Sequence, residues 1–215
     1  MTHVSWAALY EGATDAAYFD VLIPRMMEDI IVGRKLGPAT IPLAPALNFP
    51  RKTPQEVAQR ACAARAAFEL LFIHADAGGR NLANGLAARS NAYCEAMQSH
   101  CDWPRVRCIV VAPRHETEAW VLADPDAVTA ALGFRGRPES IGLPVSGTEA
   151  ERLPDPKSVL GAAIRQVRGR RRRVEPGQLF PAIAQRQSVV QLRLAPSFAR
   201  FDHNLAAALA DLCGI

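Results

Sequence analysis

The sequence predicts an α/β protein with a mostly parallel sheet, helices on both faces of that sheet, and a helical C-terminal extension. Two segments, residues 69–75 and 106–112, are continuously apolar, as strands buried on both faces are. A third apolar segment lies at residues 3–10. Between these three segments the apolar residues follow helical spacing. Strands alternating with helices of this length indicate βαβ units, whose right-handed crossovers place helices on both faces.

Residues 3–68 predict two strands and two helices that alternate along the chain. Residues 3–10 predict a buried strand that runs into Glu11 and Gly12. From Asp15 to Ile30 the apolar residues follow helical spacing, and we expect Pro24 to kink or divide that helix. Residues 39–43 predict a short edge strand, and residues 54–68 predict a helix that begins with a proline.

Further elements follow the strand at residues 69–75. We expect a helix over 81–99, a strand over 106–112 and a short helix over 125–132. Residues 133–154 are rich in Gly and Pro and predict a loop, whereas helical spacing returns at 178–185 and 196–212. We therefore predict a core over residues 1–135, with a loop, a basic segment and C-terminal helices over 136–215 packed on it.

Composition limits the class of protein. The chain has 215 residues, of which 49% are hydrophobic and 21% charged, so it can bury one sizeable core and is not of disordered type. The N-terminus lacks a basic, then apolar, leader, and no stretch reaches the roughly 18–20 apolar residues of a membrane helix. We expect a cytoplasmic protein without a membrane partner. The net charge of +4 suits an anionic partner without requiring one.

The cysteines predict free thiols in a reducing compartment. There are five, an odd number, and none forms a C-x-x-C pair. Cys94, Cys101 and Cys108 recur every seven residues with His100 among them, which would allow a metal cluster. Helical periodicity followed by a strand explains the same spacing more simply.

Acidic residues follow each of the three main predicted strands. Glu11 follows the first, Asp76 the second, and Glu116 and Glu118 the third. Because the carboxyl ends of parallel strands share one edge of a sheet, we expect these side chains to converge. Carboxylates that hold Mg²⁺ or Mn²⁺ there could neutralise a phosphate and activate water. Each acid alone could instead cap a helix.

Three segments carry a family resemblance. Residues 10–15 read YEGATD, residues 72–78 read FIHADAG, and residues 113–124 read PRHETEAWVLAD. In this order they resemble the E-G-x-T-[DE] opening, the D-x-D position and the P-x-x-E-x-E-A-W-x-L-A-D signature of Toprim-like domain-of-unknown-function family 4276. That family is related to overcoming-lysogenisation-defect-type nucleases of bacterial defence systems. The resemblance implies a Toprim/Rossmann-like fold.

The chain departs from that pattern at Gly78, where such nucleases carry a second aspartate. A replacement ligand could come from Glu116, Glu118 or Asp124, or His74 could lie near the metal from within its strand. His74 is also interpretable as an ordinary strand residue. Loss of this acid also allows a domain that binds metal weakly and serves as a binding module.

Two basic features extend the candidate site. By resemblance to the same nucleases, Lys157 is a candidate for contact with the scissile phosphate; a solvated lysine at a helix start is the alternative. A run of arginines would neutralise nucleic-acid phosphates without reading bases, or would form a solvated helix face or a subunit contact. The predicted nucleic-acid-binding residues are Arg168, Arg170, Arg171, Arg172 and Arg173.

The first hypothesis is a Mg²⁺- or Mn²⁺-dependent endonuclease or nicking hydrolase acting on DNA, with RNA as the alternative. Its catalytic residues would be Glu11, Asp76, Glu118 and Lys157, with Glu116 as a further metal ligand. The resemblance implies an ATPase partner encoded nearby in an anti-phage defence system, and the chain itself has no Gly-rich phosphate loop ending in Lys-Ser or Lys-Thr. A non-catalytic module, a phosphohydrolase acting on a small molecule, and homo-oligomer formation stay open.

Overall fold

A parallel four-stranded sheet in the order β4-β2-β5-β6 forms the centre of the computed structural model. The structure describes residues 2–78, 86, 90–169 and 174–214. The strands are β2 (Trp6–Leu9), β4 (Leu47–Phe49), β5 (Leu70–His74) and β6 (Cys108–Val111). Leu9 lies opposite Ile73, and Ile73 opposite Val110. A separate parallel pair joins β1 (Thr2–His3) to β3 (Ala39–Thr40).

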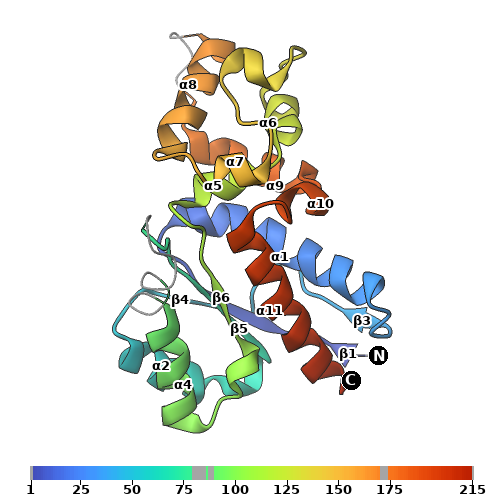
Figure 1. Ribbon diagram of the computed structural model, residues 1–215. Helices are drawn as coiled ribbons and strands as arrows, with labels where there is room; N and C mark the ends of the chain where they lie inside the picture. Colours follow the sequence, from blue (N-terminus) through green and yellow to red (C-terminus); the bar gives the residue numbers. More distant parts are fainter. Residues whose placement is uncertain (1, 79–85, 87–89, 170–173, 215) are drawn as a thin grey trace.

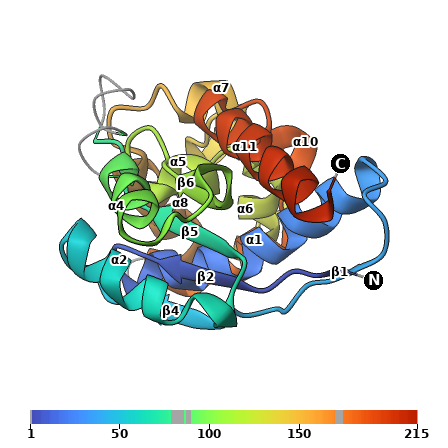
Figure 2. The ribbon, with the colours of Figure 1, turned by 90° about the horizontal axis from the view of Figure 1, so that it is seen from below.

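Helices cover both faces of the sheet (Figures 1 and 2). On one face lie α1 (Ala13–Gly33) and α11 (Pro196–Cys213), against Leu70 and Phe72 of β5. On the other lie α2 (Pro54–Ala63) and α4 (Ala92–Cys101), against Leu71 and Ile73. The chain crosses from β2 to β4 in one direction along the sheet and from β4 to β5 in the opposite direction. Because both crossovers are right-handed, α1 and α2 lie on opposite faces. The predicted α/β class is confirmed.

Shorter helices gather beyond the carboxyl ends of the strands, at the top of Figure 1. They are α5 (Thr117–Val121), α6 (Pro125–Leu132), α7 (Gly147–Ala150), α8 (Pro156–Arg168), α9 (Phe180–Arg186) and α10 (Val189–Leu192). Four 3₁₀ turns complete the described elements, at Arg65–Ala67, Arg105–Arg107, Pro138–Ile141 and Pro176–Leu179. This group of helices places the starts of α5 and α8 near the sheet edge.

The long first helix does not divide at Pro24. It continues from residue 13 to residue 33, and Pro24 is itself buried in the helix face that covers the sheet. Proline inside a helix costs roughly 3 kcal/mol. Burial of eight further side chains of α1 on that face, from Tyr18 to Ile31, offsets the cost.

The prediction of free thiols was wrong for four of the five cysteines. Disulfides join Cys62 of α2 to Cys101 of α4, and Cys94 of α4 to Cys108 of β6, whereas Cys213 is free. The pairs form between elements that the fold brings together, with Cα–Cα distances of 6.0 Å and 5.6 Å, so no local C-x-x-C motif is needed. Because disulfides are rare in reducing compartments, they weigh against the reducing cytoplasm assumed for free thiols.

None of the helices in the described ranges is long and apolar enough to cross a membrane.

Candidate active site at the carboxyl edge of the sheet

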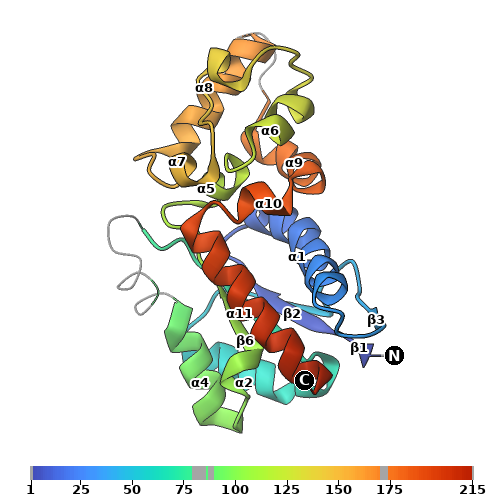
Figure 3. The same ribbon diagram turned by 45° about the vertical axis from the view of Figure 1, so that its right-hand side comes forward.

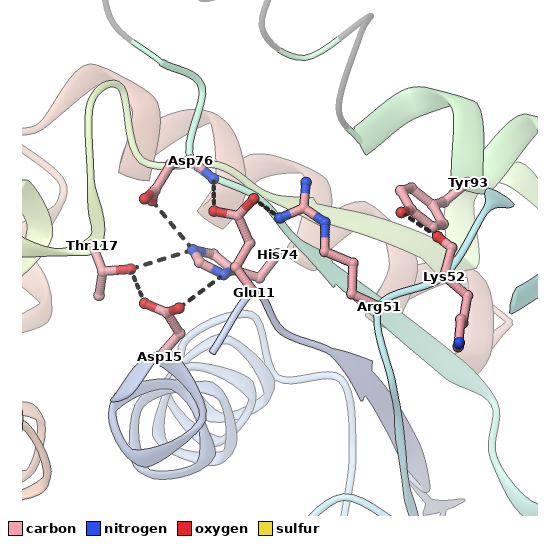
Figure 4. Close-up of polar contacts among 8 residues, drawn as sticks. All are labelled: Glu11, Asp15, Arg51, Lys52, His74, Asp76, Tyr93 and Thr117. Atoms are coloured by element: carbon pink, nitrogen blue, oxygen red, sulfur yellow. Dashed lines mark hydrogen bonds and ion pairs between the residues drawn. The ribbon is translucent and has the colours of Figure 1, made fainter. Parts of the chain in front are cut away.

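The two central strands mark the place where the order of the sheet reverses. From β2 the chain moves to β4 on one side, and from β5 it moves to β6 on the other. Ligands of open α/β sheets bind in the crevice beyond the carboxyl ends at such a point. Glu11 lies two residues after β2 and Asp76 two residues after β5. The Glu11 carboxylate accepts a hydrogen bond from the Asp76 backbone N–H at 3.3 Å (Figure 4).

Residues after β6 bring a third acidic segment to this edge. Glu116 is the N-cap residue of α5, and Glu118 lies in the first turn of that helix and is only 8% exposed. A pocket of about 560 Å³ opens between this turn, the start of α1 and the start of α8. The charged residues that line it are Asp15, Asp76, Glu116, Glu118, Lys157 and Glu175. Acids that follow β5 and β6 therefore line the pocket, whereas Glu11, which follows β2, contacts Asp76 but does not line it.

The pocket is electrostatically unfavourable for its own carboxylates. Burial raises the pKa of Glu118 above its ordinary value, and the nearby charges of Glu116 and Asp76 raise it further. Lys157 opposes this shift by favouring the charged form. The Oε2 atom of Glu116 is buried and, within the described residues, accepts no hydrogen bond. A cation bound in this pocket would stabilise the charged form of these carboxylates.

A buried histidine, His74, lies next to two of the acidic residues at this edge, Asp15 and Asp76. His74, the last residue of β5, is fully buried, and its Nε2 lies 3.5 Å from Asp76 Oδ1 and 3.3 Å from Thr117 Oγ1. Its Nδ1 lies 3.9 Å from Asp15 Oδ2, and the Thr117 hydroxyl donates to Asp15 Oδ1 at 2.6 Å (Figure 4). The ring packs against Phe19 at a centroid distance of 4.6 Å. His74 thus links the ends of β5, α1 and α5.

A basic residue also reaches this edge. Arg51 follows β4 and forms an ion pair with Glu11 (Figure 4). The side chain of Arg51 is 43% exposed and that of Glu11 20% exposed, so solvent screens the pair. Arg51 was not predicted from the sequence, because the strand that it follows, β4, has only three residues and no pattern that marks it.

Lys157 lies at the start of a helix that borders the pocket. It is the second residue of α8, whose start is capped by Asp155. The Asp155 carboxylate accepts the Ser158 backbone N–H at 2.8 Å and the Ser158 hydroxyl at 2.6 Å. These bonds keep the pKa of Asp155 low and hold the first turn of α8 in place. Lys157 therefore faces the same pocket as Glu118.

The predicted nucleic-acid-binding arginines are only partly placed. Arg168 ends α8, about 16 Å along the helix from Lys157 at 1.5 Å per residue, and does not line the pocket. Arg170, Arg171, Arg172 and Arg173 lie outside the described residues. The segment that directly follows them reaches the site, because Glu175 and Pro176 line the pocket.

Gly78 and Asp124 supply no further carboxylate to the pocket. Gly78 has a φ of 71°, a backbone conformation that favours glycine, so an aspartate there would be strained. Asp124 caps α6 through the Ala127 N–H and also accepts the Ser188 N–H at 2.7 Å. Within the described ranges, no three His, Cys, Asp or Glu side chains are grouped closely enough to hold a metal ion together.

The fold and the site define a parallel α/β protein with an acidic pocket at the switch point of its sheet. Comparisons with protein-family models, with curated proteins and with solved structures found no match. The Toprim-like resemblance therefore rests on the three sequence motifs alone.

Proposed function

We propose that this chain is a Mg²⁺- or Mn²⁺-dependent nuclease that hydrolyses phosphodiester bonds, with DNA as the first substrate to test and RNA as the alternative. One observation carries the proposal: Asp76 after β5, Glu116 and Glu118 after β6, and Lys157 line one pocket at the switch point. Glu11, which follows β2, contacts the backbone of Asp76 beside that pocket. Phosphodiester hydrolysis needs this combination, because charge on the phosphate must be neutralised while water is activated.

The side chains fit a hard divalent cation. Oxygen ligands suit Mg²⁺, which keeps several waters and is often held by only one or two carboxylates. Asp76, Glu116 and Glu118 line the pocket. Burial and, after it, repulsion from Glu116 and Asp76 raise the pKa of Glu118, and a bound cation would offset both effects. When bound, the ion would polarise the phosphate and lower the pKa of a water molecule.

The residues of the site then have distinct roles. Asp76 and Glu118 would hold the ion, with Glu116 as a further oxygen ligand. Glu11 already contacts the Asp76 backbone and would orient that segment, or act on the attacking water when Arg51 moves aside. Lys157 carries no hydrogen bond or ion pair within the described residues and can contact a phosphate oxygen.

A nucleic acid fits the charge of the whole chain. The net charge is +4, and six arginines lie between residues 165 and 173, directly before the segment that reaches the pocket. Contacts from such a run to backbone phosphates would hold a polymer without reading its sequence. The resemblance further suggests an ATPase partner encoded nearby and a role in anti-phage defence.

A second candidate function is a non-catalytic module with the same fold. Residue 78 favours it, since a glycine with a φ of 71° stands there and the second acid of the nuclease pattern is absent. Such a module would bind its partner without cleaving phosphodiesters.

Nicking of supercoiled plasmid separates the two functions. With Mn²⁺ or Mg²⁺, and with the neighbouring ATPase present and absent, we expect the parent protein to produce relaxed circles. Asp76→Asn and Glu118→Gln should each remove nearly all cleavage, and the double variant should lose little more, because residues that act as a unit are not additive.

Matched controls are Asp126→Asn and Glu139→Gln, which change exposed acids that do not line the pocket. Both should cleave as the parent does. Intact plasmid under every condition would support the module, and nicking that persists in both site variants would remove this pocket as the active site.

A further inference from the structure

The outer strand β6 offers a free sheet edge. It pairs with β5 and stands at the end of the four-stranded order, so no strand within the described residues pairs with its other side. Val110 is partly exposed, whereas the other three residues of β6 are buried. A free edge presents unpaired N–H and C=O groups that another chain can use.

The ladder with β5 determines which backbone groups face outward. Ala75 N–H donates to Val111 C=O at 3.2 Å, and Ala77 N–H donates to Pro113 C=O at 3.0 Å. In a parallel ladder alternate residues point their backbone groups to opposite sides, so those of Cys108, Val110 and Ala112 point away from β5. Arg105 confirms this direction, because its guanidinium donates to Cys108 C=O at 2.9 Å.

A groove of about 560 Å³ runs along this edge. Cys108, Val110 and Ala112 line its floor, and one stripe of α11, including Arg200 and Phe201, forms a wall. Figure 3 shows α11 alongside β6. The groove contains two arginines, Arg105 and Arg200, and no carboxylate among its described lining residues. Arg200 is exposed and makes no ion pair with any described residue. The groove therefore combines the outward backbone groups of Val110 and Ala112 with the positive charge of two arginines.

We propose that this groove binds an extended acidic segment of a partner protein by strand addition to β6. Main-chain hydrogen bonds to Val110 and Ala112 would supply affinity, and the two arginines would select acidic side chains. A second copy of this chain fits poorly, because pairing two β6 edges would bring Arg105 and Arg200 of both copies together. The groove is separate from the acidic pocket, so the inference does not depend on nuclease activity.

Peptide binding by fluorescence anisotropy tests this proposal on the full chain. The probe is a labelled peptide of about seven residues, a usual strand length, in which glutamate alternates with valine. A matched peptide has lysine for glutamate, and another has alternate backbone nitrogens methylated. We expect the parent to bind the acidic peptide at least about tenfold more tightly than either, a difference of about 1.4 kcal/mol.

Two variants locate the binding. Val110→Pro removes an outward N–H but no bond to β5, so the chain should keep its circular dichroism spectrum and lose at least about tenfold in peptide affinity. Arg200→Glu provides a second test if proline disturbs the strand, and it should weaken binding of the acidic peptide. Arg135→Glu, an exposed arginine distant from the groove in sequence and not lining it, is the matched charge control.

Three outcomes would overturn the proposal. One is equal affinity for the acidic and basic peptides. Another is no measurable binding of the acidic peptide by the parent. The third is self-association of the parent that Val110→Pro abolishes, which would assign the edge to a second copy. Unchanged peptide binding in Glu118→Gln would show that the result is independent of the acidic pocket.

Discussion

Glu118 and Asp124 belong to one short motif and yet serve different tasks. Glu118 lines the acidic pocket, where burial and two neighbouring carboxylates raise its pKa. Asp124 caps α6 and accepts the Ser188 N–H, which ties α6 to the start of α10. Asp124, which the sequence offered as a possible replacement metal ligand, therefore caps a helix instead. Only the fold separates the two roles.

The raised pKa of Glu118 makes stability depend on pH. The folded protein holds a proton on Glu118 at pH values at which the unfolded chain, with a pKa of 4.5, has lost it. The resulting penalty is complete above the folded pKa and disappears as pH falls toward the unfolded value. With EDTA present, we expect Glu118→Gln to be more stable than the parent at neutral pH, and the difference to shrink on acidification.

Urea unfolding of both proteins across this pH range measures the difference in the free energy of unfolding. Added Mn²⁺ should reverse the order at neutral pH, because only the parent retains this ligand. A difference that does not change between neutral pH and pH values near 4.5 would contradict the assigned cause of the shift.

Glu11, Asp76 and Glu118 were predicted from their positions after strands, two residues after β2, two after β5 and seven after β6. Of these, Asp76 and Glu118 line the pocket. Sequence reasoning did not reach the contacts among Asp15, His74 and Thr117, which come from three elements far apart in the chain. Their convergence depends on the angle at which α1 crosses the sheet and on how α5 turns after β6. Neither angle is encoded in residue spacing.

At the scale of elements, long apolar segments were predictable and short ones were not. The strands β5 and β6 and the helices α6 and α11 lie within or close to their expected ranges, because strong hydrophobic periodicity specifies them. The strand β4 has three residues between Pro45 and Pro50, too few for any pattern. The backbone of β2 supplies its hydrogen bonds, so its formation is a consequence of tertiary structure.

The two disulfides anchor α4 to both of its neighbours, and their removal should lower stability. Cys62 and Cys101 are separated by 39 residues, for which loop-closure entropy gives about 4 kcal/mol. Urea unfolding of the Cys62→Ser, Cys101→Ser double variant should show a loss of that order. Cys213→Ser should leave stability nearly unchanged, since that thiol is free.

Alkylation followed by mass spectrometry checks the pairing directly. The denatured, unreduced chain should take up one alkyl group, at Cys213, and the reduced chain five. Five groups without reduction would show that the thiols are free in the protein as isolated and would restore the prediction of free thiols.

For the whole molecule, part of the positive charge stands close to the site in the sequence. The arginine run precedes Glu175 and Pro176, which line the pocket, and Lys157 lines it from the start of the preceding helix. The proposed binding of a nucleic acid would use this run to contact backbone phosphates.

Binding to DNA should therefore weaken steeply with salt. Replacement of Arg170, Arg171, Arg172 and Arg173 by alanine should reduce affinity for duplexes of any sequence. It should also flatten the slope of log affinity against log salt by about 0.9 for each phosphate that the chain no longer neutralises. Anisotropy titrations at several salt concentrations give this slope. The matched variant changes Arg135 and Arg137, both outside the run, to alanine; equal slopes for the two variants would rule out binding of phosphates by the run.

The position of α11 has a consequence for biosynthesis. This helix covers Phe72 and the β6 half of the sheet, yet it begins at Pro196, more than 80 residues after β6 ends. A ribosome adds roughly 5–20 residues per second, so the nascent sheet carries an uncovered apolar face for several seconds before α11 emerges. During that interval the chain depends on chaperones or on dilution to avoid aggregation, and slower translation of residues 112–195 would lengthen the exposure.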